Sequence, residues 1–178
     1  MERVADVRPT SAIQPTTKST FAELIAPLIE PGFRLAMAML HDASAAEDAV
    51  QEASFTAWRK FGSASDEGKL RSWFLGIVAN KCRNARRRKW SADVRLGLSE
   101  ETTVPSTEDL ALRDADLRRA IASLGHDDRL VLVLYFYLDM PLEDIALVAR
   151  GSVAATRARL YRSIKKLRPN LDLQEALR

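Results

Sequence analysis

The stretch LRSWFLGIVANKCRNARRRKW, residues 70–90, decides the fold class of this chain. Its apolar side chains recur at the spacing of one helix face: Leu70, Trp73, Phe74, Ile77, Val78 and Cys82. This periodicity predicts a helix over about 69–90, with Trp73 in the core rather than on the surface. Another face of the same helix gathers Gly76, Asn80, Arg83 and Arg87. Amides and guanidinium groups beside a glycine suit close approach to a nucleic-acid backbone or base.

The basic residues are segregated along the chain. The formal net charge is only +3, yet Lys69–Trp90 and Arg150–Arg168 are rich in Lys and Arg and contain no acid. Two local positive potentials are typical of a protein that binds a polyanion. The alternative is a pair of solvated helix faces, but such faces normally intersperse both signs of charge. The charge pattern therefore favours nucleic-acid binding.

Composition excludes several other classes. The chain has 1 Cys, Cys82, and 2 His, so we expect no intramolecular disulfide and no metal site. It has no Gly-rich phosphate loop and no nucleophile arrangement, so we expect neither an enzyme nor a cofactor. The N-terminal residues lack the pattern of a signal peptide. The longest apolar run, Leu130–Leu138, is far shorter than a bilayer span, which needs about 20 residues. We expect a cytoplasmic protein without membrane insertion.

The pattern of breaks predicts an all-α protein of two small helical domains joined by a flexible linker. We expect a mobile tail over 1–20, a first domain over 21–91, a linker over 92–108 and a second domain over 109–178. In the first domain, helices should begin at Phe21, break at Pro31-Gly32 and resume over 33–41. A capping box, Ser44 to Glu47, should start a helix that runs to about Phe61 with Trp58 and Phe61 inward.

The second domain ends in a predicted helix-turn-helix. We expect helices over 109–124, 127–138 and 141–149, a turn at Arg150-Gly151, and a last helix from its N-cap Ser152 to Arg168, ended by Pro169. The core stripe of that helix would be Val153, Leu160, Ile164 and Leu167, and the residues facing away would be Ala155, Ala158, Arg159 and Arg162. Small residues with arginines suit a major groove. The alternative is a plain amphipathic helix in a bundle.

Several motifs, in order, resemble the extracytoplasmic function (ECF, group IV) sigma factors of bacterial RNA polymerase, in the sigma-70 family. Asp48-Ala-Val-Gln-Glu52 with Phe55, Ala57 and Trp58 is similar to the family's D-x-V-Q-E-x-F-x-x-A-W helix. Residues 73–80 with the basic run 86–89 are similar to its W-L-x-x-I-A-x-N segment. Residues 124–134 are similar to the helix before its helix-turn-helix, and residues 143–146, 157–162 and 165–168 are similar to the helix-turn-helix itself. The resemblance covers roughly residues 21–168.

The resemblance implies a division of labour. The polymerase would be bound by the helix of Asp48, Gln51 and Glu52, on the β′ clamp helices, with a further contact at the β flap. The −10 promoter element would meet Asn80, Arg83, Asn84 and Arg87, and the −35 element would meet Arg157, Arg159, Tyr161 and Arg162. Promoter DNA, core RNA polymerase and an anti-sigma factor are the implied partners.

Two alternative functions were considered, and several positions differ from the family pattern. A plain helix-turn-helix repressor would need neither the docking helix nor the first basic helix, and a decoy for an anti-sigma factor would gain nothing from basic helices. Departures from the family pattern are Ala155 and Ala158, which lack hydroxyls for phosphate or base, and Arg150 at the usual glycine of the turn. The acidic linker could mimic nucleic acid near the polymerase channel.

Overall fold

The protein is all-helical in a computed structural model that describes residues 16–61, 69–96 and 119–175. The elements are α1 (Thr16–Leu40), α2 (Ala43–Lys60), α3 (Leu70–Leu96), α5 (His126–Leu132), a π-helix η3 (Val133–Tyr137), α6 (Leu142–Ala149) and α7 (Val153–Glu175). None of these described residues lies in a strand, so the predicted fold class is confirmed. Residues 1–15, 62–68, 97–118 and 176–178 lie outside the described residues, and with them most of the predicted linker and the first part of the helix predicted over 109–124.

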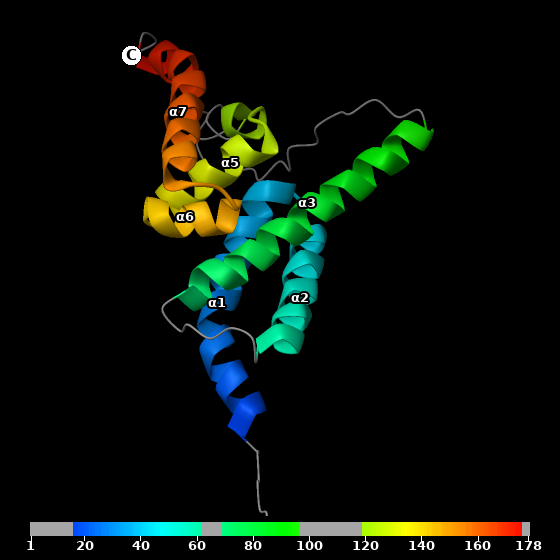
Figure 1. The fold of residues 1–178 in the computed structure, drawn as a ribbon. Coiled ribbons are helices and arrows are strands. Elements are labelled where there is room, and N and C mark those ends of the chain that lie inside the picture. Colours follow the sequence, from blue (N-terminus) through cyan, green and yellow to red (C-terminus); the bar gives the residue numbers. More distant parts are fainter. Residues whose placement is uncertain (1–15, 62–68, 97–118, 176–178) are drawn as a thin grey trace, which may run out of the picture.

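Helices α1, α2 and α3 form the N-terminal lobe (Figure 1). The apolar stripe of α3 is its centre: Phe74, Val78 and Cys82 are 0% exposed. Trp73 is half-buried and packs against this core, as predicted for a core residue. The helix starts close to the predicted residue but continues to Leu96 rather than ending near Trp90.

Helix α1 corrects the predicted break at Pro31-Gly32, because it runs unbroken through both Pro27 and Pro31. Each proline removes one backbone N–H and so frees the carbonyl four residues earlier, but these carbonyls belong to Glu23 and Pro27, which are both exposed to water. Gly32 is buried, and a Cβ there would lie 3.1 Å from Phe74 Cε1. The glycine therefore permits close helix packing rather than a turn. The helix also begins at Thr16, within the predicted tail, rather than at Phe21.

Helix α2 begins earlier than the predicted capping box. Its N-cap is Asp42, whose Oδ1 accepts a hydrogen bond of 3.0 Å from the Ala45 amide, so Ser44 is not the cap. The buried side of α2 consists of small residues: Ala46, Ala49, Val50, Ala53 and Ala57. Trp58 was predicted inward and is 45% exposed, because it lies on the face of α2 that also carries the exposed Gln51 and Phe55. Phe61 is half-buried, and its ring packs edge-on against Phe21 with centroids 5.1 Å apart.

The C-terminal lobe, residues 119–175, contains the predicted helix-turn-helix as α6 and α7. Helix α6 ends at Arg150 in the left-handed conformation (φ 56°), and the Gly151 amide donates to the Ala146 carbonyl at 2.9 Å. Ser152 caps α7 as predicted, since its Oγ accepts from the Ala155 amide at 3.1 Å. Arginine at the left-handed position is thus accommodated within an ordinary helix-ending motif.

Other details of the C-terminal lobe differ from prediction. The single helix expected over 127–138 is α5 followed by the π-helix η3. Helix α7 does not end at Pro169 but runs to Glu175. Ile164 was predicted to be core and is 38% exposed, whereas Thr156 and Ser163 are buried. Ser163 is tolerated in the interior because its hydroxyl donates to the Arg159 carbonyl at 2.9 Å.

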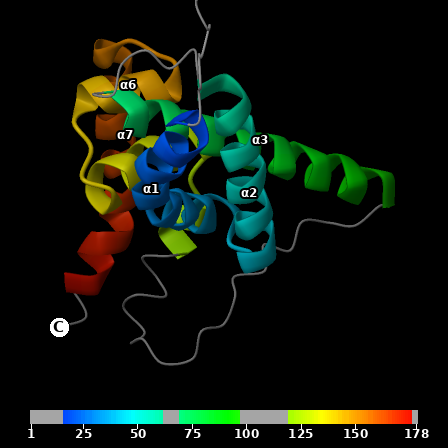
Figure 2. The ribbon, with the colours of Figure 1, turned by 90° about the horizontal axis from the view of Figure 1, so that it is seen from below.

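The two lobes share one apolar core. Ile145 and Val148 of α6 belong to the same buried cluster as Phe74 and Val78 of α3. Helix α6 lies beside the first part of α3 (Figure 2). A Cβ on Gly76 would lie 3.8 Å from Val148 Cα, so the close approach expected at this glycine is made by α6 and not by nucleic acid. The basic part of α3 projects beyond this contact.

Candidate nucleic-acid interface

The predicted −10 residues lie on α3, in and beyond the part covered by α6. Asn84 and Arg87 are exposed, while Asn80 and Arg83 are half-buried. Arg83 Nη1 donates to Asn80 Oδ1 at 3.5 Å, which couples these two residues along one side of the helix. The basic run that follows, Arg86 to Lys89, is exposed. Helix α3 therefore presents a cationic surface that extends out of the N-terminal lobe.

The predicted −35 residues lie on α7 and divide into two groups. Arg157, Tyr161 and Arg162 are exposed, with Tyr161 at 71%. Arg159 instead turns inward and pairs with Asp127, with 3.0 Å between Nη1 and Oδ2. The expectation that Arg159 faces away from the protein is therefore wrong in this conformation, because an acid of α5 competes with solvent for its guanidinium group.

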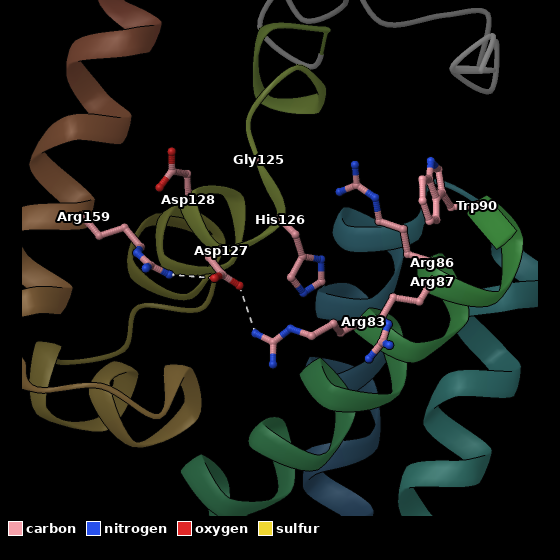
Figure 3. A pocket seen from close by; sticks show the side chains of 9 residues that line it. All are labelled: Arg83, Arg86, Arg87, Trp90, Gly125, His126, Asp127, Asp128 and Arg159. Carbon is pink, nitrogen blue, oxygen red and sulfur yellow. Dashed lines mark hydrogen bonds and ion pairs between the residues drawn. The ribbon is translucent and has the colours of Figure 1, made fainter. Parts of the chain in front are cut away.

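Asp127 connects the two basic helices, and sequence reasoning missed this role. Its Oδ1 accepts from Arg83 Nη2 on α3 at 2.9 Å, and its Oδ2 faces Arg159 on α7 (Figure 3). Burial raises the pKa of the Asp127 carboxyl, but the hydrogen bond and charge of Arg83, together with Arg159, lower the pKa overall. Its position in the first turn of α5 gave the only sequence signal, and that signal indicates a helix start rather than a partner.

A cavity of about 620 Å³ opens between the lobes around this carboxylate. Its walls are Arg83, Arg86, Arg87, Trp90, Gly125, His126, Asp127, Asp128 and Arg159 (Figure 3). Both ring nitrogens of His126 are buried there without a hydrogen-bond partner among the described residues. Burial, and then the charge of Arg83, lower the pKa of His126 to about 4, so the ring is neutral at pH 7. The charged residues of the cavity wall are therefore four arginines and two aspartates, so the wall carries a net positive charge.

The predicted polymerase-binding residues lie on α2. Asp48 and Gln51 are exposed, whereas Glu52 pairs with α3 through Lys81 at 3.0 Å and Arg88 at 3.6 Å. The hydrogen bond from Lys81 lowers the pKa of Glu52. Phe55, at 58%, and Trp58 are also exposed on this helix, with ring centroids 6.0 Å apart. The helical spacing of Asp48, Gln51, Phe55 and Trp58 could have placed them on one face.

Other kinds of site are not seen in the described part of the chain. No group of His, Cys, Asp and Glu there could hold a metal ion. Among the same residues, no helix combines the length and the apolar character needed to cross a membrane.

Comparison with known proteins matches both lobes to one family. The Sigma-70 region 2 family model matches residues 26–92, and the Sigma-70, region 4 model matches residues 114–167. RNA polymerase sigma-H factor of Pseudomonas aeruginosa is 31% identical over 143 residues, which are 72% of this chain and 74% of that protein. RNA polymerase sigma factor SigV of Bacillus subtilis is 26% identical over 160 residues, covering 90% of this chain and 96% of SigV. ECF RNA polymerase sigma factor SigL of Mycobacterium tuberculosis is 28% identical over 151 residues, 80% of this chain and 82% of SigL.

Solved structures share the fold. The sigma factor RpoE from Bartonella quintana, in complex with the anti-sigma factor NepR, aligns with a TM-score of 0.69 and 22% identity over 86% of this chain and 98% of RpoE. CnrH, in complex with the cytosolic domain of CnrY, aligns with a TM-score of 0.65 and 24% identity over 88% of this chain and 90% of CnrH. Both matched regions, their order and the shared fold agree with the residue patterns on α2, α3 and α7. The chain belongs to the sigma-70 family of RNA polymerase sigma factors, in its extracytoplasmic function group.

Proposed function

We propose that this sigma factor directs promoter-specific initiation by contacting the −10 element with α3 and the −35 element with α7, while core RNA polymerase performs the catalysis. The observation that carries the proposal is the pair of basic helices, one in each matched region, with side chains open to solvent. Asn84 and Arg87 are exposed on α3, and Arg157 and Arg162 are exposed on α7. Two separate cationic surfaces suit two separate promoter elements.

The −10 contact would use Asn80, Arg83, Asn84 and Arg87. Amides can hydrogen-bond base edges, and guanidinium groups neutralise phosphates, so the surface suits a strand whose bases have been unstacked. Trp73 takes no part, since it packs against the core. The exposed Trp90 lies at the cavity beside the arginines and could stack on a base.

The −35 contact would use the exposed side of α7. Arg157, Tyr161 and Arg162 can reach duplex DNA directly in this conformation, and the exposed Ala155 and Ala158 let the helix approach a major groove closely. Arg159 would join them only after leaving Asp127. Base choice at the −35 element would therefore depend on arginines more than on hydroxyl groups.

The partners follow from the same assignment. Asp48 and Gln51, extended by the exposed Phe55 and Trp58, form the surface that would dock on the β′ clamp helices. Glu52 would contribute after exchanging its Lys81 and Arg88 partners. A contact with the β flap of polymerase and an anti-sigma factor complete the proposed partners. The proposed site of action is the cytoplasm, where core polymerase and promoter DNA are found.

Run-off transcription with purified core polymerase and a library of promoter fragments tests the proposal. Initiation at a subset of fragments should depend on this chain. Arg157→Ala should weaken binding to the selected −35 sequence by about 1–3 kcal/mol. Arg59→Ala is the matched control for DNA binding, because Arg59 is an exposed arginine on α2 whose guanidinium contacts Phe55 of the same helix. Fragment binding without any effect on initiation would instead indicate a repressor and overturn the proposal.

A further inference from the structure

The Asp127 carboxylate divides its two oxygens between the two proposed promoter-reading helices. Oδ1 accepts from Arg83 of α3 at 2.9 Å, and Oδ2 lies 3.0 Å from Nη1 of Arg159 of α7. Helix α5, which carries Asp127, belongs to the C-terminal lobe, so the Arg83 contact crosses between the lobes (Figure 3). One acid therefore holds an arginine from each basic helix at the same point.

Each arginine turns one guanidinium nitrogen to this carboxylate, which leaves the side chains of Arg83 and Arg159 only 38% and 34% exposed. An arginine side chain reads guanine or clamps a phosphate through the guanidinium N–H groups that here face a carboxylate. The other arginines of the proposed DNA contacts, Arg87, Arg157 and Arg162, stay exposed. The carboxylate thus occupies the position that a phosphate or a base edge would take.

Hydrogen bonds to backbone carbonyls and direct packing hold the lobes in the same arrangement. Arg71 Nη2 on α3 donates to the Leu138 carbonyl at 2.6 Å, and Arg129 Nη1 on α5 donates to the Met39 carbonyl of α1 at 3.3 Å. The Gly76–Val148 approach adds direct packing between α3 and α6. The Asp127 carboxylate therefore adds a charge-dependent contact to an interface that packing and these hydrogen bonds also support.

We propose that Asp127 is an internal competitor for promoter DNA: it closes the lobes and masks Arg83 and Arg159 until polymerase or promoter separates them. This inference rests on the proposed function, because only promoter contact gives the masked arginines a role. A partly exposed ion pair is weak and is screened by salt, so the closure is reversible. A promoter, with many phosphates, can displace a single carboxylate.

The test uses Asp127→Asn in the full chain, with Asp128→Asn as its matched control. Asp128 is the adjacent acid and loses the same charge, but its partner is Lys166 of α7, within the C-terminal lobe, at 2.6 Å. Binding of Asp127→Asn to a −35/−10 promoter fragment without polymerase should tighten by about threefold to tenfold at low salt. Asp128→Asn should show no more than the small gain that any lost negative charge gives.

The separation of the lobes is measured in parallel with spin labels on Ser44→Cys of α2 and Ala154→Cys of α7, both exposed sites. Cys82 stays unlabelled because it is 0% exposed, and burial raises the pKa of its thiol to about 12. Asp127→Asn should add a population with a longer interlabel distance, whereas Asp128→Asn should match the parent. Far-ultraviolet circular dichroism checks that each variant is folded.

The outcomes separate the two proposals. Equal distance distributions for the two variants would overturn the closure, and longer distances without tighter promoter binding would overturn the masking. Failure of the parent chain to support run-off transcription would instead refute the proposed function, while the distance measurement would still report on Asp127.

Discussion

Replacing the buried Arg129 by methionine should cost a large part of the stability of this protein. Arg129 is 4% exposed, and burial, followed by the charge of Arg86, lowers its pKa to about 10, so it is still a cation at pH 7. Its guanidinium group is surrounded by backbone oxygens and one imidazole: it donates to the carbonyls of Met39, Ile121, Ala122 and Leu124 and contacts His41 Nε2. Methionine fills a similar length without donating a hydrogen bond.

The magnitude follows from which carbonyls can recover a partner. The bonds to Met39 (3.3 Å) and Leu124 (3.1 Å) are buried, whereas those to Ile121 and Ala122 are only part-buried and can be replaced by water. A buried carbonyl without a partner costs about 1–3 kcal/mol, so the two buried ones predict a loss of about 2–6 kcal/mol. Methionine spares the desolvation of a cation, which places the result in the lower half of that range.

Urea unfolding followed by circular dichroism at 222 nm measures this loss, with Arg162→Met as the control. Arg162 is exposed, and its described hydrogen bond is to the Ala158 carbonyl of its own helix, so the control should stay within about 0.5 kcal/mol of the parent. Arg129→Lys should fall between the two, because one ammonium group cannot reach acceptors on several sides. A loss below about 1 kcal/mol for Arg129→Met would refute the view that this guanidinium joins the two lobes.

Three further predictions concern stability. Arg150→Gly should raise the free energy of unfolding by up to about 1 kcal/mol, seen as a higher melting temperature, because Arg150 has φ 56° and glycine takes that conformation without a steric cost. Asp42→Ala should lower it by about 1 kcal/mol in the same assay, since the Ala45 amide loses its cap; no change would mean that Ser44 takes over. The pKa of His126 is about 4 when folded against an ordinary 6.5, so the unfolded chain takes up the proton first, and stability should fall as pH decreases from about 6.5 toward about 4. Urea midpoints across that range should show a weaker fall for His126→Asn. The charged side chains that act on His126 are Arg83, Asp127, Arg86 and Arg129.

The sequence pattern predicted correctly several features that depend only on residues close together in the chain. The stripe of α3 and the Ser152 cap depend on residues within one helix or one turn, and both are confirmed. The predicted break at Pro31-Gly32 was wrong, because Gly32 makes room for the side chain of Phe74, a residue of another helix. Trp58 was misplaced for a different reason, because helical spacing puts it on the same face as Gln51 and Phe55, which are both exposed.

The difference between local causes and contacts distant in sequence also explains which site residues were placed correctly. Arg83 and Arg159 have the right chemistry for DNA and were chosen for it, but their positions are decided by Asp127, which lies far from both in sequence. The proposed contact residues therefore fall into two sets: Asn84, Arg87, Arg157, Tyr161 and Arg162 are open, whereas Arg83 and Arg159 are held by Asp127 and Asn80 accepts a hydrogen bond from Arg83. Because only open side chains can meet a phosphate first, we expect promoter encounter to begin with the open set. Arg83 and Arg159 would then add base contacts as the lobes separate, so discrimination between promoters would follow encounter rather than accompany it.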